Sequence, residues 1–586
     1  MNSKTQLIVL FGLGMLAPAA HAQTASPDTL EWSLEELMSV VVTSVSRKSQ
    51  TLAETAAAVH VISAEDIRRS GARSIPEALR LAPGVQVAAI GNNKWAVSIR
   101  GFADRCSNKL RVRVDGRSVY TPLFSGVLWE ALDLPLESIA RIEVIRGPGA
   151  SIWGANAVNG VINILTRSAF DSQGSQVTAA TGSELRGQGY ARHGWSPDPD
   201  TAVSFYAKLH DVDAAQTRTG VAGVDDWQGQ TADFRLERLL ENGSMRIQGG
   251  ATRTHAGDEV MLTTAPPATP LVAATEKVSS AYLMMHWENP SGSTREDSLR
   301  FSLEHSDYRH AILTEHRITA DLEYQRRSRL DARQDLIWGL AYRYSADRID
   351  DSPLIQVDER ARGSELFSAY AQDDIDLIPG RWRLSLGARL ERNDYTGLGF
   401  QPNLRLLWTP DTRNSAWLSL ARAHRTPSRI ERGGSAYIQA DPVGTPPWVP
   451  PSVVQLLSGS LDEERLTALD LGWRHQFNAA ASLDVAVFFN RYDNLRGAAY
   501  GAPLLVPPAG YLLIQTSENN ANSADVHGLE ASLDWRPASA WRLGVNSSWL
   551  QYRVHTATLP GQSPSDYADV SPSLQFSRSE ERTSEL

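Results

Sequence analysis

The sequence predicts a transmembrane antiparallel β-barrel that follows a small α+β domain. Three observations support this fold class. The chain begins with an export signal, no later apolar run approaches the ~18 residues of a membrane-spanning helix, and alternating segments of about ten residues fill the chain after Gly174. Because the lipid interior offers no water to unpaired backbone groups, a chain without such helices can cross it only as a closed sheet.

Residues 1–22 read as a signal peptide. Lys4 precedes an apolar stretch from Leu7 to Leu16, and Ala20-His21-Ala22 has the small-residue pattern of a cleavage site. We therefore expect the mature chain to begin at Gln23.

Residues 51–168 mix helix and strand signals. Ser63 and Asp66 have the spacing of a capping box at the start of one short helix. A second helix is expected over IPEALRLAPG, with Pro76 at its start and its end at Pro83-Gly84. The stretches VQVAAI, WAVSIRG, LRVRVDG, ARIEVIRG and VINIL read as strands. A segment of about 120 residues is long enough to fold as a domain.

Four glycines separate two of these strands in RIEVIRGPGASIWGANAVNGVINILT, residues 141–166. A dinucleotide fingerprint would need a glycine at the position of Ile152, and the Gly-Lys pair of a P-loop is absent. A β-strand follows, where a phosphate site would need a helix N-terminus. We therefore expect these glycines to permit close backbone approach and not to hold a nucleotide.

The segments after Gly174 alternate with period two. In WRLSLGARLER, the apolar side chains from Trp382 to Leu390 share one face, and Arg383, Arg389 and Glu391 lie on the other. A soluble β-sandwich or propeller gives the same alternation. Tryptophans near the segment ends favour the membrane barrel, because they match an interfacial aromatic girdle. They are Trp382, Trp408, Trp417, Trp473, Trp535, Trp541 and Trp549.

Composition limits the possible functions. A formal net charge of −10 without a basic block argues against nucleic acid as a partner. The single cysteine, Cys106, excludes an intramolecular disulfide and a cysteine-ligated metal cluster. No GxSxG, HExxH or SxxK motif occurs in a fitting context, so the sequence predicts neither an enzyme nor a cofactor.

A set of motifs connects the chain to a known family. VVVTSVSRKSQ, VHVISAEDIRRSG, SIPEALRLAPGVQV, SIRGF, VDGRSVYTP and IARIEVIRGPGASIWGANAVNGVINI follow one another between residues 38 and 168, and RTPS and DVHGLEASLDW come later. This set resembles the TonB-dependent outer-membrane receptors of the cobalamin and catecholate-siderophore type. The resemblance implies a small α+β plug domain inside a transmembrane antiparallel β-barrel. The implied divisions are a signal peptide (1–22), an N-terminal segment with a TonB box (23–50), the plug (51–168) and the barrel (175–586).

The stretch SVVVTSVS, residues 39–46, resembles the TonB box. It is uncharged and β-prone, so it suits addition as an extended strand to the sheet edge of a partner. The residues assigned to the box are Val40, Val41, Val42, Thr43, Ser44 and Val45. The alternative is that this stretch is the first strand of the plug. The implied partner is TonB with its inner-membrane ExbB/ExbD motor.

The resemblance also assigns plug residues to docking within the barrel. Charged members are expected to pair with carboxylates on the barrel wall, and the glycines to allow close approach in a tight turn. The docking residues are Arg100, Gly101, Phe102, Arg141, Glu143, Arg146, Gly147 and Pro148.

Ligand is expected between the extracellular loops and the apices of the plug. The aromatic candidates for ligand contact are Trp95, Tyr120, Phe124, Trp129 and Trp448, and structural packing is an equal alternative for each. No metal site is predicted. His305, Asp307 and His310 lie close in sequence, and residues 347–359 are acidic, but an exposed loop explains both without a metal.

Two features depart from the family. The strand Leu110-Arg111-Val112-Arg113-Val114 places two arginines on one face, which would compromise the strand if that face were buried. The chain ends in the polar FSRSEERTSEL, and we count about 17 or 18 strand candidates against the roughly 22 that the resemblance implies. These features predict a receptor truncated at its C-terminus, with an incomplete barrel that does not insert.

The resulting hypothesis is a monomeric receptor in the outer membrane of a Gram-negative bacterium, in contact with outer-membrane lipid. It would import a scarce small ligand, with a ferric siderophore as the first choice, driven by the inner-membrane proton gradient through TonB. The alternatives are a cobalamin or oligosaccharide receptor, or a truncated remnant that does not transport.

Overall fold

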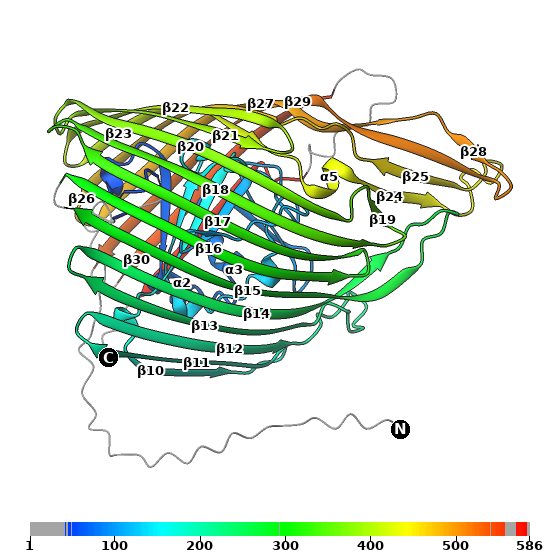
Figure 1. Cartoon of the computed structure of the whole chain (residues 1–586), viewed down its shortest axis with the longest axis horizontal. Helices are drawn as coiled ribbons and strands as arrows, with labels where there is room; N and C mark the ends of the chain where they lie inside the picture. Colours follow the sequence, from blue (N-terminus) through cyan, green and yellow to red (C-terminus); the bar gives the residue numbers. More distant parts are fainter. Residues whose placement is uncertain are drawn as a thin grey trace, which may run out of the picture.

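The computed structural model describes residues 41–42, 45–48, 50–291, 294–538, 541–556 and 570–582. The predicted signal peptide lies outside the described residues. A small domain of mixed helices and strands, drawn in blue and cyan, lies inside a large curved sheet of long tilted strands (Figure 1). The predicted fold class, a plug within an antiparallel barrel sheet, is confirmed.

The plug is built on a five-stranded sheet with the order β3-β8-β9-β6-β7. β6 and β9 are parallel, and the other neighbours are antiparallel. A separate hairpin pairs β4 with β5. The strands are β3 (Ala58–Ser63), β4 (Val85–Ala89), β5 (Trp95–Ile99), β6 (Leu110–Val114), β7 (Arg117–Ser118), β8 (Ile139–Arg146) and β9 (Gly160–Thr166). Each of the five stretches expected to be strands therefore forms one.

Short helices cover this sheet. Helix α2 (Ala64–Ser70) starts with the expected capping box, in which the Asp66 backbone N–H donates to Ser63 Oγ at 3.0 Å. Helix α3 (Ile75–Leu79) ends before the predicted Pro83-Gly84 stop. The remaining plug helices are the single turns η1 (Leu52–Glu54), η2 (Trp129–Ala131), η3 (Leu136–Ser138), α4 (Ala150–Trp153) and η4 (Phe170–Ser172). In the part of the chain that the structure describes, no helix is both long and apolar enough to cross a membrane.

The glycine-rich stretch joins β8 to β9 and contains the unexpected single-turn helix α4. Gly147 has a φ of 100°, and a Cβ there would lie 2.9 Å from both Arg100 Nη1 and Asp470 Oδ2. A Cβ on Gly160 would lie 2.7 Å from the Ile145 carbonyl oxygen. These glycines thus allow the close approach that the sequence predicted.

The large sheet has 22 strands in sequence order, β10 to β31. β18 pairs directly with β20, β23 with β26, and β27 with β29. Through these pairings, 18 of the described strands form a continuous wall, and the other four extend beyond it. The first nine wall strands are β10 (Gly174–Ala180), β11 (Leu185–Asp198), β12 (Thr201–Val212), β13 (Trp227–Leu240), β14 (Gly243–Met261), β15 (Leu271–Ser291), β16 (Arg295–His310), β17 (Leu313–Arg329) and β18 (Gln334–Asp351). The other nine are β20 (Ala361–Ile378), β21 (Trp382–Asn393), β22 (Gly397–Asp411), β23 (Asn414–Arg425), β26 (Glu464–Asn478), β27 (Ala481–Tyr500), β29 (Tyr511–Ala538), β30 (Trp541–His555) and β31 (Leu574–Arg582).

The two ends of the wall differ. At one end, the short-turn end, only a few residues join neighbouring strands, as between β22 and β23. At the other, the long-loop end, residues 426–463 join β23 to β26 and contain helix α5 (Arg429–Gly433), β24 (Gly434–Asp441) and β25 (Ser452–Leu457). Together with β19 (Ile355–Val357) and β28 (Leu504–Val506), these strands project beyond the wall (Figure 1). Among the described residues, no hydrogen-bonded pairing joins β10 to β31.

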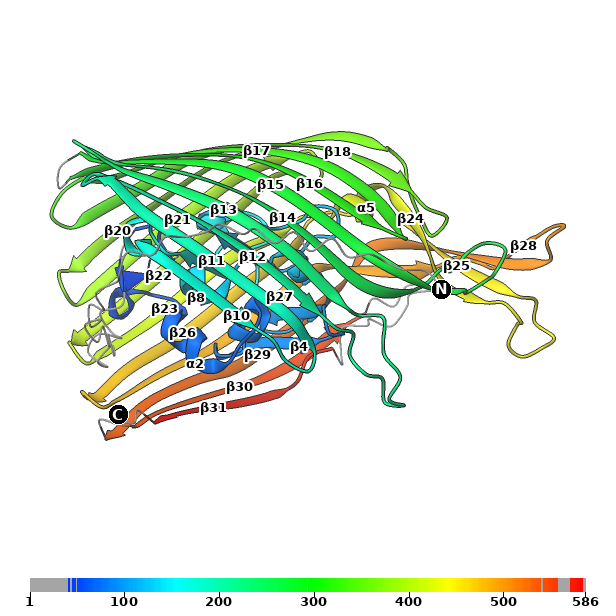
Figure 2. The same ribbon diagram turned by 90° about the horizontal axis from the view of Figure 1, so that it is seen from below.

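Alternation along the wall strands separates an outer apolar face from an inner polar face. On β21, Leu386 and Leu390 are exposed, whereas Ser385 and Arg389 are buried toward the plug. Trp417 is an exception to the predicted girdle: it is 4% exposed and points inward, where the Arg474 guanidinium lies 4.2 Å from its ring centroid. Plug elements α2 and β4 lie within the curve of the wall in the view from below (Figure 2).

Candidate functional site

Two plug arginines dock against carboxylates of the barrel wall. Arg100 donates from Nη1 to Asp470 Oδ1 at 2.7 Å and from Nε to Glu530 Oε1 at 3.0 Å. Arg146 Nη1 donates to the other oxygen of Glu530 at 3.0 Å. Both arginines and Glu530 have side chains at most 2% exposed. The cluster therefore fixes strand β8 and the end of β5 to strands β26 and β29.

Arg141 and Glu143 were also expected to face the wall. Arg141 Nε donates to Glu143 Oε1 at 2.8 Å. Both side chains leave the face of β8 opposite to that of Arg146. Docking of Arg141 and Glu143 on the wall stays a prediction.

The other predicted docking residues lie beside the Arg100 cluster. The Phe102 ring packs between Tyr492 and Tyr552 of the wall, with centroid separations of 4.7 and 5.1 Å. A Cβ on Gly101 would lie 3.2 Å from the Tyr552 ring. Gly147 and Pro148 are buried in the turn that follows Arg146.

The described part of the predicted TonB box is docked on the plug. Val41 and Val42 form β1 (Val41–Val42) and pair with β2 (Gln50–Thr51). Val42 and Val45 are buried in an apolar cluster shared with the wall. Val40, Thr43 and Ser44 lie outside the described residues. Strand pairing with the plug is the alternative that the sequence left open, and the role of residues 40–45 as a TonB box stays a prediction.

Two cations directly after this segment bind the wall at the short-turn end. Arg47 pairs with Glu323, and its Nη1 donates to the Tyr370 hydroxyl at 2.9 Å. Lys48 Nζ donates to Asp335 at 2.8 Å and also pairs with Asp374. No local pattern in the sequence indicates these contacts, because the partners lie hundreds of positions away in the chain.

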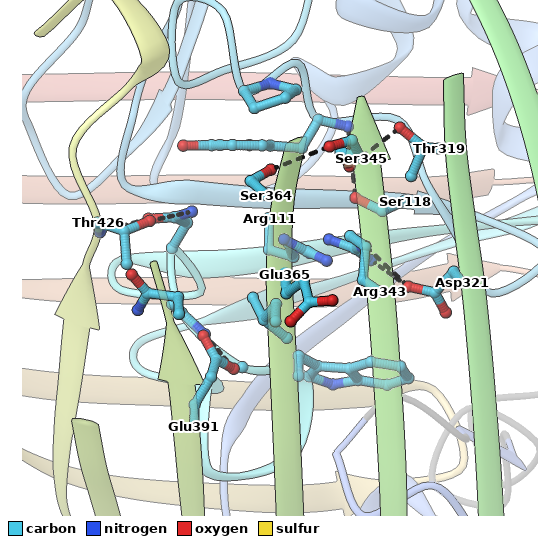
Figure 3. A pocket seen from close by; sticks show the side chains of 18 of the residues that line it. Arg111, Ser118, Thr319, Asp321, Arg343, Ser345, Ser364, Glu365, Glu391 and Thr426 are labelled. Carbon is cyan, nitrogen blue, oxygen red and sulfur yellow. Dashed lines mark hydrogen bonds and ion pairs between the residues drawn. The ribbon is translucent and has the colours of Figure 1, made fainter. Parts of the chain in front are cut away.

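A polar cavity of about 140 Å³ lies between the plug and strands β16, β17, β18, β20 and β21 of the wall. Figure 3 shows its lining, with side chains from β17, β18 and β20 of the wall directed toward those of the plug. The arginines that line it are Arg47, Arg111, Arg113, Arg117, Arg317, Arg343 and Arg389. The lining carboxylates are Glu304, Asp321, Glu323, Glu365, Glu391 and Asp394.

Arg111 and Arg113, which departed from the family pattern, line this cavity from the plug strand β6. Their side chains are 6% and 4% exposed, so this face of the strand is buried, the alternative that the sequence left open. The buried face lies against polar groups of the cavity and not against an apolar core. Arg113 donates to the Gly116 carbonyl and stacks on Trp153, with 4.7 Å between its Cζ and the ring centroid. Val112 and Val114 occupy the opposite face, in the plug core. The strand is therefore intact.

A second cavity of about 380 Å³ lies toward the short-turn end, between Arg47, Asp115, Arg246 and Arg300. Arg47, Trp153 and Glu323 line both cavities. The Arg47 guanidinium lies 4.4 Å from the Trp153 ring centroid. The Arg47–Glu323 pair and the Trp153 ring thus form the partition between the two cavities.

The five aromatic candidates for ligand contact have different surroundings. Tyr120 lines the polar cavity. Trp95 and Trp129 are buried in the plug core, and Phe124 packs edge-to-face against Tyr308. Trp448 is 83% exposed in the loop between β24 and β25. Ligand contact by these residues stays a prediction.

The possible metal ligands considered from the sequence do not converge. His305 and Asp307 lie on the outer face of β16, whereas His310 points inward. His310 instead approaches Asp258 and Glu276. Lys94 Nζ lies 3.0 Å from Asp258, and Arg105 Nη2 lies 2.5 Å from Glu276, so both carboxylates already face cations. We propose no metal there.

Two protein-family models together match nearly the whole of the described chain. "TonB-dependent Receptor Plug Domain" matches residues 51–161, and "TonB dependent receptor-like, beta-barrel" matches residues 162–578. Among curated relatives, the vitamin B12 transporter BtuB of Vibrio vulnificus is 36% identical over 148 residues, which is 25% of this chain and 23% of that protein. BtuB of Photobacterium profundum is 32% identical over 262 residues, 42% of each chain. The chain thus spans less than half the length of these curated relatives.

Solved structures share the fold. The siderophore receptor PirA from Pseudomonas aeruginosa superposes with a TM-score of 0.66 at 18% identity, covering 85% of this chain and 86% of that one. A ferric enterobactin receptor (PfeA) mutant from the same organism gives a TM-score of 0.68 at 17% identity, covering 87% and 82%. At these identities the likeness establishes the fold alone. The relatives are named as receptors and transporters.

Proposed function

The chain belongs to the family of TonB-dependent receptors, and from this premise we propose that it binds a small ligand at the long-loop end of an outer-membrane barrel and passes it to the periplasm. The short-turn end, where the N-terminal segment lies, would face the periplasm. Export by the signal peptide, a Gram-negative host, a monomeric state and energy from ExbB/ExbD through TonB belong to the same proposal.

The observation that carries this function is the arginine-lined cavity between plug and wall. It begins near Tyr395 and Thr426, just inside the long loops, and reaches down to Arg47. Such a cavity gives a polar ligand space along the plug, and the partition of Arg47, Glu323 and Trp153 separates it from the second cavity. A plug that simply filled the barrel with apolar packing would offer no such space.

The charge of this cavity favours an anionic ligand. Seven arginines line it against six carboxylates, and Arg111 forms no ion pair with any carboxylate of the described residues. Ferric iron held by three catecholates is an anion, which the guanidinium groups would attract. We therefore propose a ferric siderophore as the ligand, with cobalamin and oligosaccharide as the alternatives.

Coupling to TonB follows from the position of residues 40–45. These residues precede Arg47 and Lys48 directly, so force on them would first break the Arg47–Glu323 and Lys48–Asp335 contacts. Breaking the first contact removes the partition between the two cavities. The partner would thus join the two cavities by pulling, without unfolding the whole plug sheet.

Replacing residues 40–45 by a Gly-Ser segment of equal length tests the function. We expect uptake of a radiolabelled ferric catecholate siderophore to be lost, whereas its binding to whole cells stays within about twofold, because the cavity is untouched. A Gly-Ser replacement of residues 26–31 serves as the control and should leave uptake intact. Uptake at the wild-type rate after the first replacement would contradict the proposal.

A further inference from the structure

Arg111 is a buried cation without a counter-charge. Its side chain leaves strand β6 of the plug sheet, is 6% exposed and makes no ion pair or hydrogen bond among the described residues. Its one ring contact is with Tyr120, at 5.8 Å from Cζ to the centroid. A cation–π contact at that distance is weak compared with the cost of removing a guanidinium from water.

The surroundings of Arg111 add positive charge. Arg343 of strand β18 lies next to it in the cavity, and its guanidinium lowers the pKa of Arg111, although burial is the larger cause (Figure 3). Two carboxylates whose charges act on Arg111 are already engaged: Asp321 with Arg343 at 2.6 Å, and Glu391 with Arg389 at 3.1 Å. The charge of Arg111 is thus left over after the neighbouring pairs have formed.

Hydroxyl groups complete the lining. Ser118 of β7, Thr319 of β17, Ser345 of β18 and Ser364 of β20 all border the same cavity as Arg111 (Figure 3). Hydroxyls and guanidinium N–H groups are the donors that bind oxyanions, and a planar guanidinium can bind one through two parallel hydrogen bonds.

We propose that Arg111, together with Arg343 and these hydroxyls, forms an internal anion-binding site that holds a carboxylate, catecholate or phosphate group. The physical reason is that a buried unpaired charge is costly, and an anion in the cavity supplies the missing partner. The paired arginines of the same cavity, such as Arg117 with Glu304 at 2.5 Å, have no such need.

The use of this site by a passing ligand rests on the proposed function, but the site itself does not. A small inorganic anion tests it on the purified protein, without TonB, membrane energy or a transported ligand. If uptake fails, the phosphate-binding result still stands. If phosphate binding fails, the transport proposal is still tested separately by the replacement of residues 40–45.

Equilibrium dialysis of the full chain in detergent with labelled inorganic phosphate, in a chloride-free buffer, measures the site directly. The variants are Arg111→Gln, which removes the charge, and Arg111→Lys, which keeps it. The control is Arg348→Gln on the same strand as Arg343, because its side chain is 73% exposed. We expect Arg111→Gln to weaken phosphate binding at least about tenfold, the loss of one charge-assisted hydrogen-bond pair. Arg111→Lys should fall between, and Arg348→Gln should stay within about twofold of wild type.

A second measurement covers the case in which a variant binds poorly because it folds poorly. In the absence of phosphate, Arg111→Gln should unfold at a higher urea concentration than wild type, because it removes an unpaired buried charge. Added phosphate should then raise the midpoint of the wild type but not that of the variant. Saturable phosphate binding of equal affinity in wild type and Arg111→Gln, or no saturable binding in the wild type, would overturn the proposal.

Discussion

Arg100 of the plug and Glu530 of the barrel wall are 430 residues apart in the sequence and are joined by an Nε–Oε1 hydrogen bond of 3.0 Å. Glu530 also accepts from Arg146, so one wall carboxylate holds two plug cations. Asp470 binds the remaining side of Arg100. Because all these side chains are buried, the cluster is complete only when the plug sits in the barrel.

Substituting Glu530 should loosen the plug. Glu530→Ala leaves Arg100 with Asp470 and leaves Arg146 with only the more distant Asp484, at 3.9 Å. Removal of one partner from a buried pair costs about 3–5 kcal/mol. We expect the plug to become sensitive to trypsin at a lower urea concentration. Asp525→Ala, on the same strand but with a side chain 47% exposed, is the control and should have little effect. Equal protease sensitivity of the two variants would contradict a docking role for Glu530.

The turn after Arg146 should tolerate no side chain. Gly147→Ala combines a positive φ of 100° with a Cβ placed 2.9 Å from the Arg100 and Asp470 head groups. Gly71→Ala, in the same domain, has a similar backbone cost, at a φ of 71°, but nothing within 4 Å of its Cβ. The difference in unfolding free energy between the two variants therefore measures the cost of crowding around the new Cβ at residue 147. We expect this cost to be about 1–3 kcal/mol. The midpoints of urea-induced plug unfolding measure it; equal midpoints would show that crowding is unimportant.

The plug strands could be predicted from the sequence because each carries a local signal. Alternating β-branched residues marked β8 and β9, and the Ser63-Asp66 capping box marked α2. The alternation on β21 likewise separated its outward leucines from the inward Arg389. Helix α3 ended early, at Leu79, which shows how weakly a Pro-Gly stop signal fixes the last turn.

The pairing of plug with wall could not be predicted, because it depends on contacts between residues hundreds of positions apart. Glu530 reads as one more polar residue on the inner face of a strand, and nothing near it in sequence indicates Arg100. The same limit explains why the wall contacts of Arg47 were overlooked. For Arg111 the sequence showed an arginine on a plug strand, but the cavity that it lines is formed by plug and wall together.

Releasing the N-terminal segment should expose it to TonB. Arg47→Ala with Lys48→Ala removes the contacts to Glu323, Asp335 and Asp374, so the docked form of residues 40–45 becomes less populated. Apparent affinity rises with the fraction of receptor that is competent to bind. We expect a soluble periplasmic fragment of TonB to bind the ligand-free double variant about tenfold more tightly. The control Arg73→Ala alters an exposed plug arginine, and an unchanged affinity in the double variant would contradict a holding role for Arg47 and Lys48.

Plug stability should depend on pH through Glu130. Arg105 Nη2 lies 2.5 Å from both Glu130 and Glu276, so one cation serves two buried carboxylates. Burial, with a smaller effect of Glu276, raises the pKa of Glu130 to about 8. The folded state therefore binds a proton that the unfolded state releases near its ordinary pKa. The contribution of this proton to stability is complete below that ordinary pKa and is lost as the pH rises toward 8.

The substitution Glu130→Gln tests this dependence, because it mimics the protonated carboxyl group at every pH. Between about pH 5 and pH 8 the unfolding free energy of the wild-type plug should fall by up to about 1.4 kcal/mol per pH unit more than that of Glu130→Gln. The two proteins should be similar at pH 5, and the variant more stable at pH 8. Urea midpoints at a series of pH values measure the slope, with Glu137→Gln as the control on the same domain. If the curves of wild type and Glu130→Gln stay parallel across this range, Glu130 is not the group that titrates, and the Arg105 cluster must hold both carboxylates ionised.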